Sequence, residues 1–194
     1  MSILVLTSDT LIGTPAAGNL EYNGQFYGTD SNASRAQMQR FTQPTVINTT
    51  SGTTALFSSI PSWARKITVG LSSVTYASTS LITIQLGTSG GLVSSGYTGQ
   101  VYTQNTSAST FSTAFLLQAA NSSGSANSGI ATLFEVDSTN NIWAFASTLG
   151  SVGSTAASMG GGRVALASAL TQLQISTVAG TTFSAGAVNI MYEG

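Results

Sequence analysis

Residues 81–86 read LITIQL, and this stretch shows the pattern that decides the fold. Ile82 and Ile84 alternate with Thr83 and Gln85, so apolar and polar side chains follow one another with a period of two. Successive side chains of a β-strand point to opposite faces of a sheet. The stretch therefore predicts a strand with one buried face and one wet face, as in antiparallel sheets.

The rest of the chain repeats this signal. Similar alternation occurs in KITVGL (66–71), TQLQIST (171–177) and AVNIMYE (187–193). Less regular apolar runs, which predict strands covered on both faces, are STAFLLQ (112–118), IATLFEV (130–136), NIWAFAST (141–148) and RVALASAL (163–170). Turn signals lie between the runs, among them Gly90-Gly91, Asp137 to Asn141 and Gly160-Gly161-Gly162. Many short strands with such spacing predict an all-β fold, an antiparallel β-sandwich that is jelly-roll-like.

Helix signals are rare in this sequence. SNASRAQMQRF (31–41) fits a short helix or an extended linker equally well. SSIPSW (58–63) reads as a non-helical corner in which Trp63 closes one end of the sandwich. A change in composition near Phe41 to Pro44 divides the chain into an N-terminal segment, residues 1–44, and a sandwich domain, residues 45–194.

The N-terminal segment contains a hairpin signal. NLEYNGQFYGT (19–29) has two short runs around Asn23-Gly24, a pair that tolerates the positive φ angles of a type I′ turn. A two-stranded hairpin is marginally stable alone in water, so it needs a partner. We expect an assembly hairpin that uses the side chains of Tyr22, Asn23, Gly24, Phe26 and Tyr27.

Composition excludes several classes of function. The 194 residues contain no Cys and no His, which removes disulfides, thiolate metal sites and the usual general base. Only 6% of residues are charged, against about a quarter in an ordinary domain. Five cations do not make a basic stripe, so we expect no nucleic-acid binding. We expect no cofactor and no enzymatic activity.

The sequence predicts no membrane insertion, because it has no apolar run of 18 residues. Its opening, MSILVLTSDT, lacks the positive start of a secretory signal. We therefore expect synthesis in a cytoplasm without export by that route.

Candidate chemical sites are few, and each has a plain structural explanation. Glu135 and Asp137 share one face of a strand, as paired carboxylates or calcium ligands would, but Asp137 enters a turn and fits a local hydrogen-bonding role better. The Gly160-Gly161-Gly162-Arg163 run lacks the helix of a phosphate loop. Arg65-Lys66 reads as an edge charge that discourages wrong strand pairing. We expect neither a catalytic nor a metal site.

Two tyrosines form the only binding site that the residues suggest. Tyr97 and Tyr102 lie in SSGYTGQVYTQNTS (94–107), a polar stretch expected to be a long loop. Tyrosine rings beside Asn, Gln and Ser donors suit saccharides, because each ring has an apolar face and a polar tip. The alternative is that both rings cover a sandwich edge or an interface.

The order of these motifs resembles tail-fibre and other appendage proteins of tailed bacteriophages. The resemblance is carried by LTSDTLIGTPAAGNLEYNGQFYGTDSNASRAQ (6–37), IPSWARKITVGLSSVT (60–75), LITIQLGTSGGLVSSGY (81–97) and FSAGAVNIMYE (183–193). It implies a homotrimer on a virion, attached to other virion proteins through the N-terminal segment, with a β-rich part that meets the host surface. We expect that this part binds a host-surface glycan.

The resemblance leaves the place on the virion open. At 194 residues there is room for one knob and no shaft. The expected function is the knob of a short tail or baseplate fibre that recognises the host surface. The alternatives are a capsid decoration protein, such as a cement or head-fibre protein, and a free carbohydrate-binding module.

Overall fold

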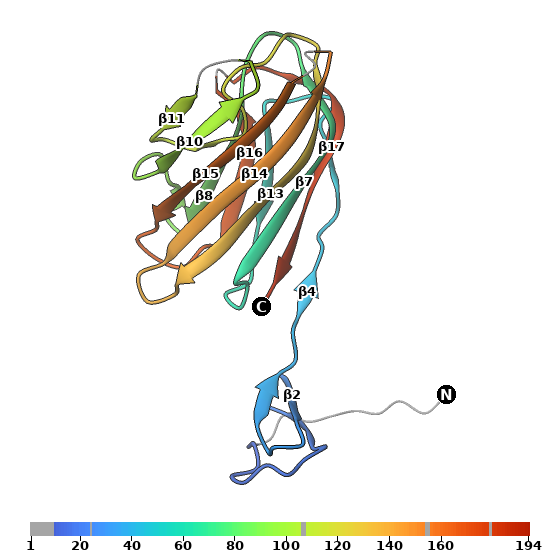
Figure 1. Ribbon diagram of the computed structural model, residues 1–194, viewed down its shortest axis with the longest axis vertical. Helices are drawn as coiled ribbons and strands as arrows, with labels where there is room; N and C mark the ends of the chain where they lie inside the picture. The colour runs from blue at the N-terminus through green and yellow to red at the C-terminus, as the bar shows by residue number, and fades with distance from the viewer. Residues whose placement is uncertain (1–9, 24, 106–107, 154–155, 179) are drawn as a thin grey trace, which may run out of the picture. The chain divides into compact units, whose positions relative to one another are not determined.

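The protein is an all-β chain, which confirms the predicted fold class (Figure 1). The computed structural model describes residues 10–23, 25–105, 108–153, 156–178 and 180–194. The chain divides into two compact units, Met1–Arg40 and Phe41–Gly194. The second unit begins before the predicted boundary at residue 45, because Phe41 and Thr42 already pair with its last strand.

The N-terminal unit is a small antiparallel sheet in the order β1-β2-β3. Its strands are β1 (Leu20–Tyr22), β2 (Phe26–Thr29) and β3 (Arg35–Gln37). The third strand lies in the stretch that fitted a helix or an extended linker, and the extended conformation is the observed one. The register pairs Tyr22 with Phe26, so three residues separate the paired positions instead of the two of a type I′ turn. Gly24 itself lies outside the described residues.

A partly buried ion pair holds this small unit together. Glu21 on β1 is only 8% exposed, and its carboxylate accepts hydrogen bonds from Arg35 Nε at 2.8 Å and Nη2 at 3.0 Å. The same carboxylate accepts the backbone N–H of Ile12 at 2.7 Å, and Arg35 also donates to the Ile12 carbonyl. One charge pair therefore ties β1, β3 and the preceding segment together, in a unit too small to bury much apolar surface.

The second unit is a sandwich of a large and a small antiparallel sheet. The large sheet consists of β4 (Phe41–Thr42), β5 (Ile47–Asn48), β7 (Lys66–Tyr76), β10 (Thr98–Thr103), β11 (Ser109–Phe111), β13 (Ala126–Asp137), β14 (Ile142–Val152), β15 (Ala156–Ala165) and β17 (Phe183–Glu193). The small sheet consists of β6 (Thr54–Ser58), β8 (Ile82–Thr88), β9 (Gly91–Leu92), β12 (Phe115–Leu116) and β16 (Gln172–Thr177).

The chain passes repeatedly from one sheet to the other. The large sheet has the order β11-β10-β15-β14-β13-β7-β17-β4, with β5 also on β17, and the small sheet has the order β12-β8-β16-β6, with β9 on β8. Consecutive strands such as β6, β7 and β8 therefore alternate between the small and the large sheet, as in a jelly roll. Figure 1 views the outer face of the large sheet, with β8 and β16 behind it.

The core lies between the sheets and contains the side chains that alternation placed there. Ile82, Ile84 and Leu86 on β8 are fully buried, and so are Ile67 and Val69 on β7. Four aromatic rings add to the apolar layer: Phe115 stacks on Phe145 with centroids 4.4 Å apart, and the rings of Tyr97 and Phe111 meet Phe115 edge-on. The predicted inner faces of these strands are thus confirmed.

Trp63 closes one end of the sandwich, as its corner position predicted. It packs against the core and meets Tyr192 edge-on, with ring centroids 5.8 Å apart. This end is where β7 begins and β17 finishes.

One predicted turn is wrong. Gly160-Gly161-Gly162 lies inside β15, and that strand ends at Ala165 instead of running through residues 163–170 as predicted. The glycines serve close approach: a Cβ on Gly162 would lie 2.8 Å from Cζ of Phe111 and 2.5 Å from the Thr98 carbonyl oxygen. The bare backbone therefore lets the edge of the Phe111 ring approach β15 at Gly162, where small size explains the glycine better than turn formation does.

This geometry predicts that two neighbouring glycines differ sharply in their tolerance of a methyl group. Gly162→Ala should lower the free energy of unfolding by about 1–3 kcal/mol, because the new methyl overlaps the Phe111 ring and the backbone of β10. Gly161→Ala is the matched control, since its Cβ would meet only Phe145 oxygen at an ordinary 3.6 Å. Urea unfolding of both variants measures the difference, and equal losses would contradict the packing described.

Candidate interaction surface

Large apolar side chains gather on the outer face of the large sheet. Ile130 and Phe134 on β13 are 56% and 53% exposed, Met159 on β15 is 61% exposed, and Val152 at the end of β14 is 77% exposed. Tyr102 on β10 is 45% exposed. We call the surface defined by these five side chains the large-sheet face.

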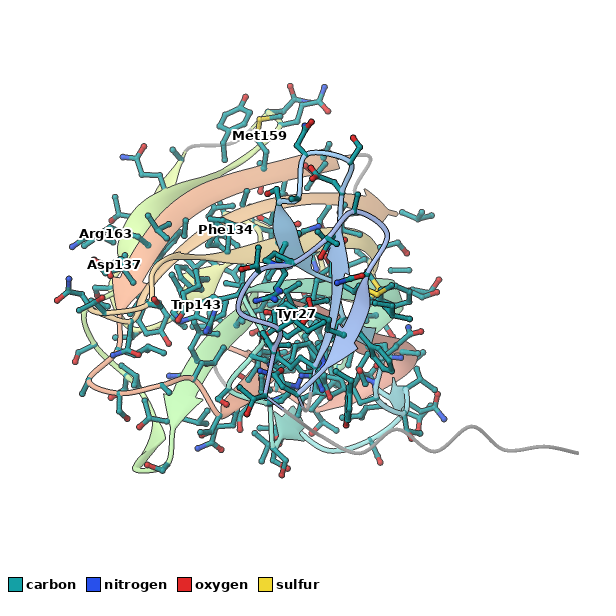
Figure 2. The ribbon with its side chains drawn as sticks, turned by 90° about the horizontal axis from the view of Figure 1, so that it is seen from below. Tyr27, Phe134, Asp137, Trp143, Met159 and Arg163 are labelled. Carbon is teal, nitrogen blue, oxygen red and sulfur yellow. The ribbon has the colours of Figure 1, made fainter. Side chains whose placement is uncertain are left out.

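Strand register brings most of this face into one row. Tyr102 lies opposite Met159, Met159 opposite Thr148, and Thr148 opposite Ile130. Residues directly opposite on neighbouring strands lie about 5 Å apart, so the four side chains form a continuous band across β10, β15, β14 and β13. Figure 2 shows Met159 pointing away from the sandwich, whereas Trp143, from the alternate position on β14, lies between the sheets.

The surface beside this row is recessed because the residues that form it have small side chains. Ala144 and Ala146 on β14, together with Gly161 on β15, occupy outward positions next to Phe134 and Met159. A shallow hollow of about 290 Å³ opens between Tyr102 and Met159 on β10 and β15. Protruding apolar side chains next to small residues and a hollow give this surface a shape with which another protein surface can interlock.

The charges near this face lie at one end of the sheet. Lys66 Nζ is 2.9 Å from Glu193 Oε1, and Arg65 Nη1 is 2.8 Å from Glu135 Oε2. Arg163 stands opposite Ala144, in the same row as Lys66 and Phe134 at that end. The middle of the face is therefore neutral, so covering it requires little desolvation of charge.

The large-sheet face differs from what the sequence predicted for IATLFEV (130–136). The pattern predicts a strand covered on both faces, but nothing among the described residues of the sandwich unit covers its outer side. Ala131 and Leu133 are fully buried while Ile130 and Phe134 are more than half exposed. The strand thus has apolar side chains on both faces, as a strand buried on both faces would have, but only its inner face is buried.

The two tyrosines of the predicted saccharide site are separated by the fold. Tyr97 is 1% exposed, its ring packs edge-on to Phe115, and its hydroxyl accepts the Leu86 N–H at 2.8 Å. The expectation that it lies in a surface loop is therefore wrong, because this apolar ring completes the aromatic core next to β10. Tyr102 lies on β10 itself, within the large-sheet face. The two rings form no common platform.

The predicted assembly hairpin has accessible aromatic side chains. The rings of Tyr22 and Phe26 tilt against each other with centroids 5.0 Å apart, and Phe26 is 42% exposed. Tyr27 pairs with Glu21 on one side and Gln37 on the other, and Asn23 donates its N–H to the Gln25 carbonyl. The role of these residues in assembly stays a prediction.

The carboxylates of β13 are engaged in structural contacts. Glu135 pairs with Arg65, and the strand bulges between Glu135 and Asp137, which separates the two groups. Asp137 accepts the N–H groups of Thr139 and Asn140 and the side-chain amide of Asn140, whose hydrogen bond lowers the pKa of Asp137. The turn interpretation of Asp137 is confirmed. Among the described residues, no three acidic side chains gather where they would hold a metal ion.

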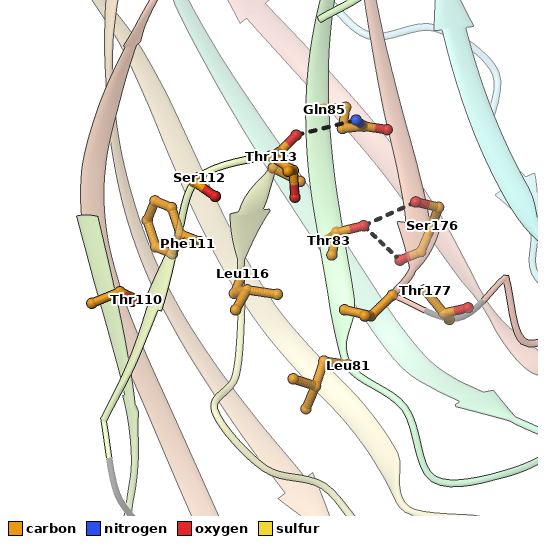
Figure 3. Close-up of a pocket in the computed structure, with 12 residues that line it drawn as sticks. Leu81, Thr83, Gln85, Thr110, Phe111, Ser112, Thr113, Leu116, Ser176 and Thr177 are labelled. Atoms are coloured by element: carbon orange, nitrogen blue, oxygen red, sulfur yellow. Dashed lines mark hydrogen bonds between the residues drawn. The ribbon is translucent and has the colours of Figure 1, made fainter. Parts of the chain in front are cut away.

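A second feature, a groove of about 360 Å³ over β8 and β16, lies on the opposite side of the sandwich. Figure 3 shows residues that line it. The segment 110–114 forms one wall of this groove. No motif in the sequence indicated this groove. Alternation marked Thr83 and Gln85 as outward-facing, but the wall that makes them a groove comes from a distant connection.

Comparisons with known proteins add no assignment. No family model, no curated protein and no solved structure matches this chain. In the described part of the chain, no helix is long and apolar enough to cross a membrane.

The buried Tyr97 predicts a loss of stability at alkaline pH. Desolvation raises the pKa of Tyr97 to about 12, and burial likewise raises the pKa of Tyr76. A folded-state pKa above the unfolded value of about 10 means that folding favours the protonated phenol. The contribution of the protonated phenol to the free energy of unfolding is complete below pH 10 and is lost as pH rises towards 12.

The urea midpoint should therefore fall between about pH 9 and about pH 11.5, and the fall should be smaller in Tyr97→Phe. For Tyr97 alone the pKa difference corresponds to about 2–3 kcal/mol at the alkaline limit. Tyr102→Phe is the control on the surface. If the pH dependence were identical in wild type and Tyr97→Phe, the buried phenol would not be its source.

Proposed function

We propose that the chain is a structural protein of a tailed-bacteriophage virion, the knob of a short tail or baseplate fibre that takes part in host-surface recognition. The observation that carries this proposal is the large-sheet face, an apolar surface that one copy leaves uncovered. Such a surface suits a subunit built to assemble. The sequence resemblance to phage appendage proteins supplies the setting.

The occupant of the large-sheet face is a further copy of the same chain. Strands β15, β14 and β13, spaced about 4.8 Å apart and about ten residues long, together with the shorter β10, span roughly 600 Å². A standard interface takes about 800 Å² from each partner. Three copies around a threefold axis, as the resemblance implies, would each contribute this face to a shared apolar centre.

The N-terminal unit has a different part in this proposal. It is a separate compact unit whose stability rests on its own ion pair between Glu21 and Arg35. It also exposes Leu20, Phe26 and Met38. These features suit an attachment module that binds another virion protein while the sandwich assembles.

The place of the protein on the virion is tested by labelling intact particles. Antibodies against the purified chain should label virions of the phage that encodes it at the tail end. Labelling spread over the head would favour the capsid decoration alternative. Particles that carry no label, with the chain found free in the lysate, would contradict the virion proposal and favour a free carbohydrate-binding module.

Self-association through the large-sheet face is tested by placing a charge at its centre. Ile130→Lys should convert the assembled protein to monomers, because a lysine would be buried without a partner in the interface. Leu56→Lys, an exposed position of similar type on β6 in the small sheet, is the matched control and should leave the mass unchanged. Light scattering measures both, and an Ile130→Lys variant that stays assembled would rule out this interface.

A further inference from the structure

The groove over the small sheet is a defined site with its own chemistry. Its floor is formed by β8 and β16, and one wall by the connection from β11 to β12. Twelve residues line it, among them Thr83, Gln85 and Ser176. None of these twelve residues is ionisable. The groove therefore offers hydroxyl, amide and aliphatic groups and no formal charge.

A pair of hydroxyls is fixed at the floor. Thr83 Oγ1 lies 2.9 Å from Ser176 Oγ, and its hydroxyl also reaches the Ser176 carbonyl oxygen at 3.3 Å (Figure 3). Each hydroxyl has one donor and two acceptor positions, so the mutual bond leaves further positions for a ligand. Thr83 is only 6% exposed, which fixes the orientation of the pair before any ligand arrives.

A side-chain amide is fixed beside this pair. Gln85 Nε2 donates to the carbonyl oxygens of Thr113 at 3.2 Å and Val93 at 3.4 Å. Both partners are acceptors, so they determine which end of the amide is the nitrogen. Gln85 Oε1 then remains as an acceptor. The groove thus presents a hydroxyl pair and an amide oxygen that are oriented in advance.

These groups select one class of ligand. An ion would find no opposite charge, and a purely apolar molecule would leave the remaining acceptor positions of the hydroxyl pair and of Gln85 Oε1 unused. A neutral sugar has hydroxyls that donate and accept, and a C–H face that fits the aliphatic side chains of Leu81, Leu116 and Val178. A volume of about 360 Å³ lies at the lower end of the usual range for small-molecule sites.

We propose that this groove is a binding subsite for a neutral saccharide unit. The proposal deepens the host-surface role and rests on it for its biological purpose. It replaces the pair of Tyr97 and Tyr102 with a site on the other side of the sandwich. A copy that covers its large-sheet face in an assembly keeps this groove open to solvent.

We expect the groove to bind a sugar weakly in one copy and more strongly in an assembly. Phe111 is 8% exposed and contributes its ring to the core, so the groove has no open aromatic platform for a sugar ring. Hydrogen bonds alone give modest affinity in water. Several copies on one particle bind a repeating glycan with an avidity that exceeds a single site by about 10²–10⁴-fold.

The test uses the full chain and saturation-transfer NMR with methyl glycosides of glucose, galactose, mannose and N-acetylglucosamine. At least one neutral glycoside should receive saturation, and glucuronic acid should receive none. Thr83→Val combined with Ser176→Ala should weaken that binding about tenfold, the effect of losing about 1.4 kcal/mol of hydrogen bonding. Near-UV circular dichroism verifies that the variant is folded.

The chain provides a matched control for this variant. Thr75 Oγ1 and Ser184 Oγ form the same kind of hydroxyl pair at 2.8 Å, outside the groove. Thr75→Val with Ser184→Ala should leave sugar binding unchanged. A second groove variant, Gln85→Leu, removes the amide acceptor without touching the hydroxyl pair and should weaken binding as well.

Two results would overturn the groove proposal: no saturation of any neutral glycoside, or equal binding by wild type and both groove variants. Neither result bears on self-association, which is read from the mass of the protein. A monomer that binds sugar through Thr83 and Ser176 would support the saccharide site and contradict the proposed fibre knob. An assembled protein that binds no sugar would support self-association and contradict the saccharide site.

Discussion

The apolar outer face of β13, β14 and β15 is the constraint on which the account of this protein depends. Strand β13 places large apolar side chains on both of its faces, and β14 and β15 add Val152 and Met159 to the outer face, yet the small sheet covers only the inner one. Hydrophobic burial of the inner side chains stabilises the sandwich, whereas Ile130, Phe134 and Met159 remain in water in a single copy. The scarcity of charge has the same consequence, because a neutral surface is cheap to desolvate and offers little protection against self-association.

The two outer surfaces of the sandwich have different chemistry. The large-sheet face is broad and apolar, with small residues between its projecting side chains. The small sheet carries a narrow groove lined by neutral hydrogen-bonding groups. Because the two sheets lie back to back, an assembly that covers the first surface leaves the second available. We propose that this separation lets one compact unit assemble and bind a ligand together.

The sequence predicted the sandwich because alternation is a local property: Ile82, Ile84 and Leu86 are buried wherever β8 lies in the sheet. It failed where long-range packing decides. The glycines at 160–162 fit a turn by sequence alone, and only the close approach of Phe111, from another strand, to Gly162 shows why small residues stand in a strand here. Tyr97 looks like a loop residue until β8 supplies its hydrogen-bond partner. The groove needs residues 110–114 beside β8, which no short motif encodes. The sequence shows the excess of apolar side chains in residues 130–136, but it does not show which neighbour covers them.

The central claim is that copies of the chain meet through the large-sheet face, and distances between copies test it most directly. The chain has no native cysteine, so a single Thr148→Cys places one spin label in the middle of that face, between Ile130 and Met159. Gln174→Cys places a comparison label on the outer side of the small sheet. Pulsed electron–electron double resonance should give a short distance with a narrow distribution between copies for the label at 148. The distance for the label at 174 should be longer. The reverse order, or no coupling between copies at 148, would contradict the account.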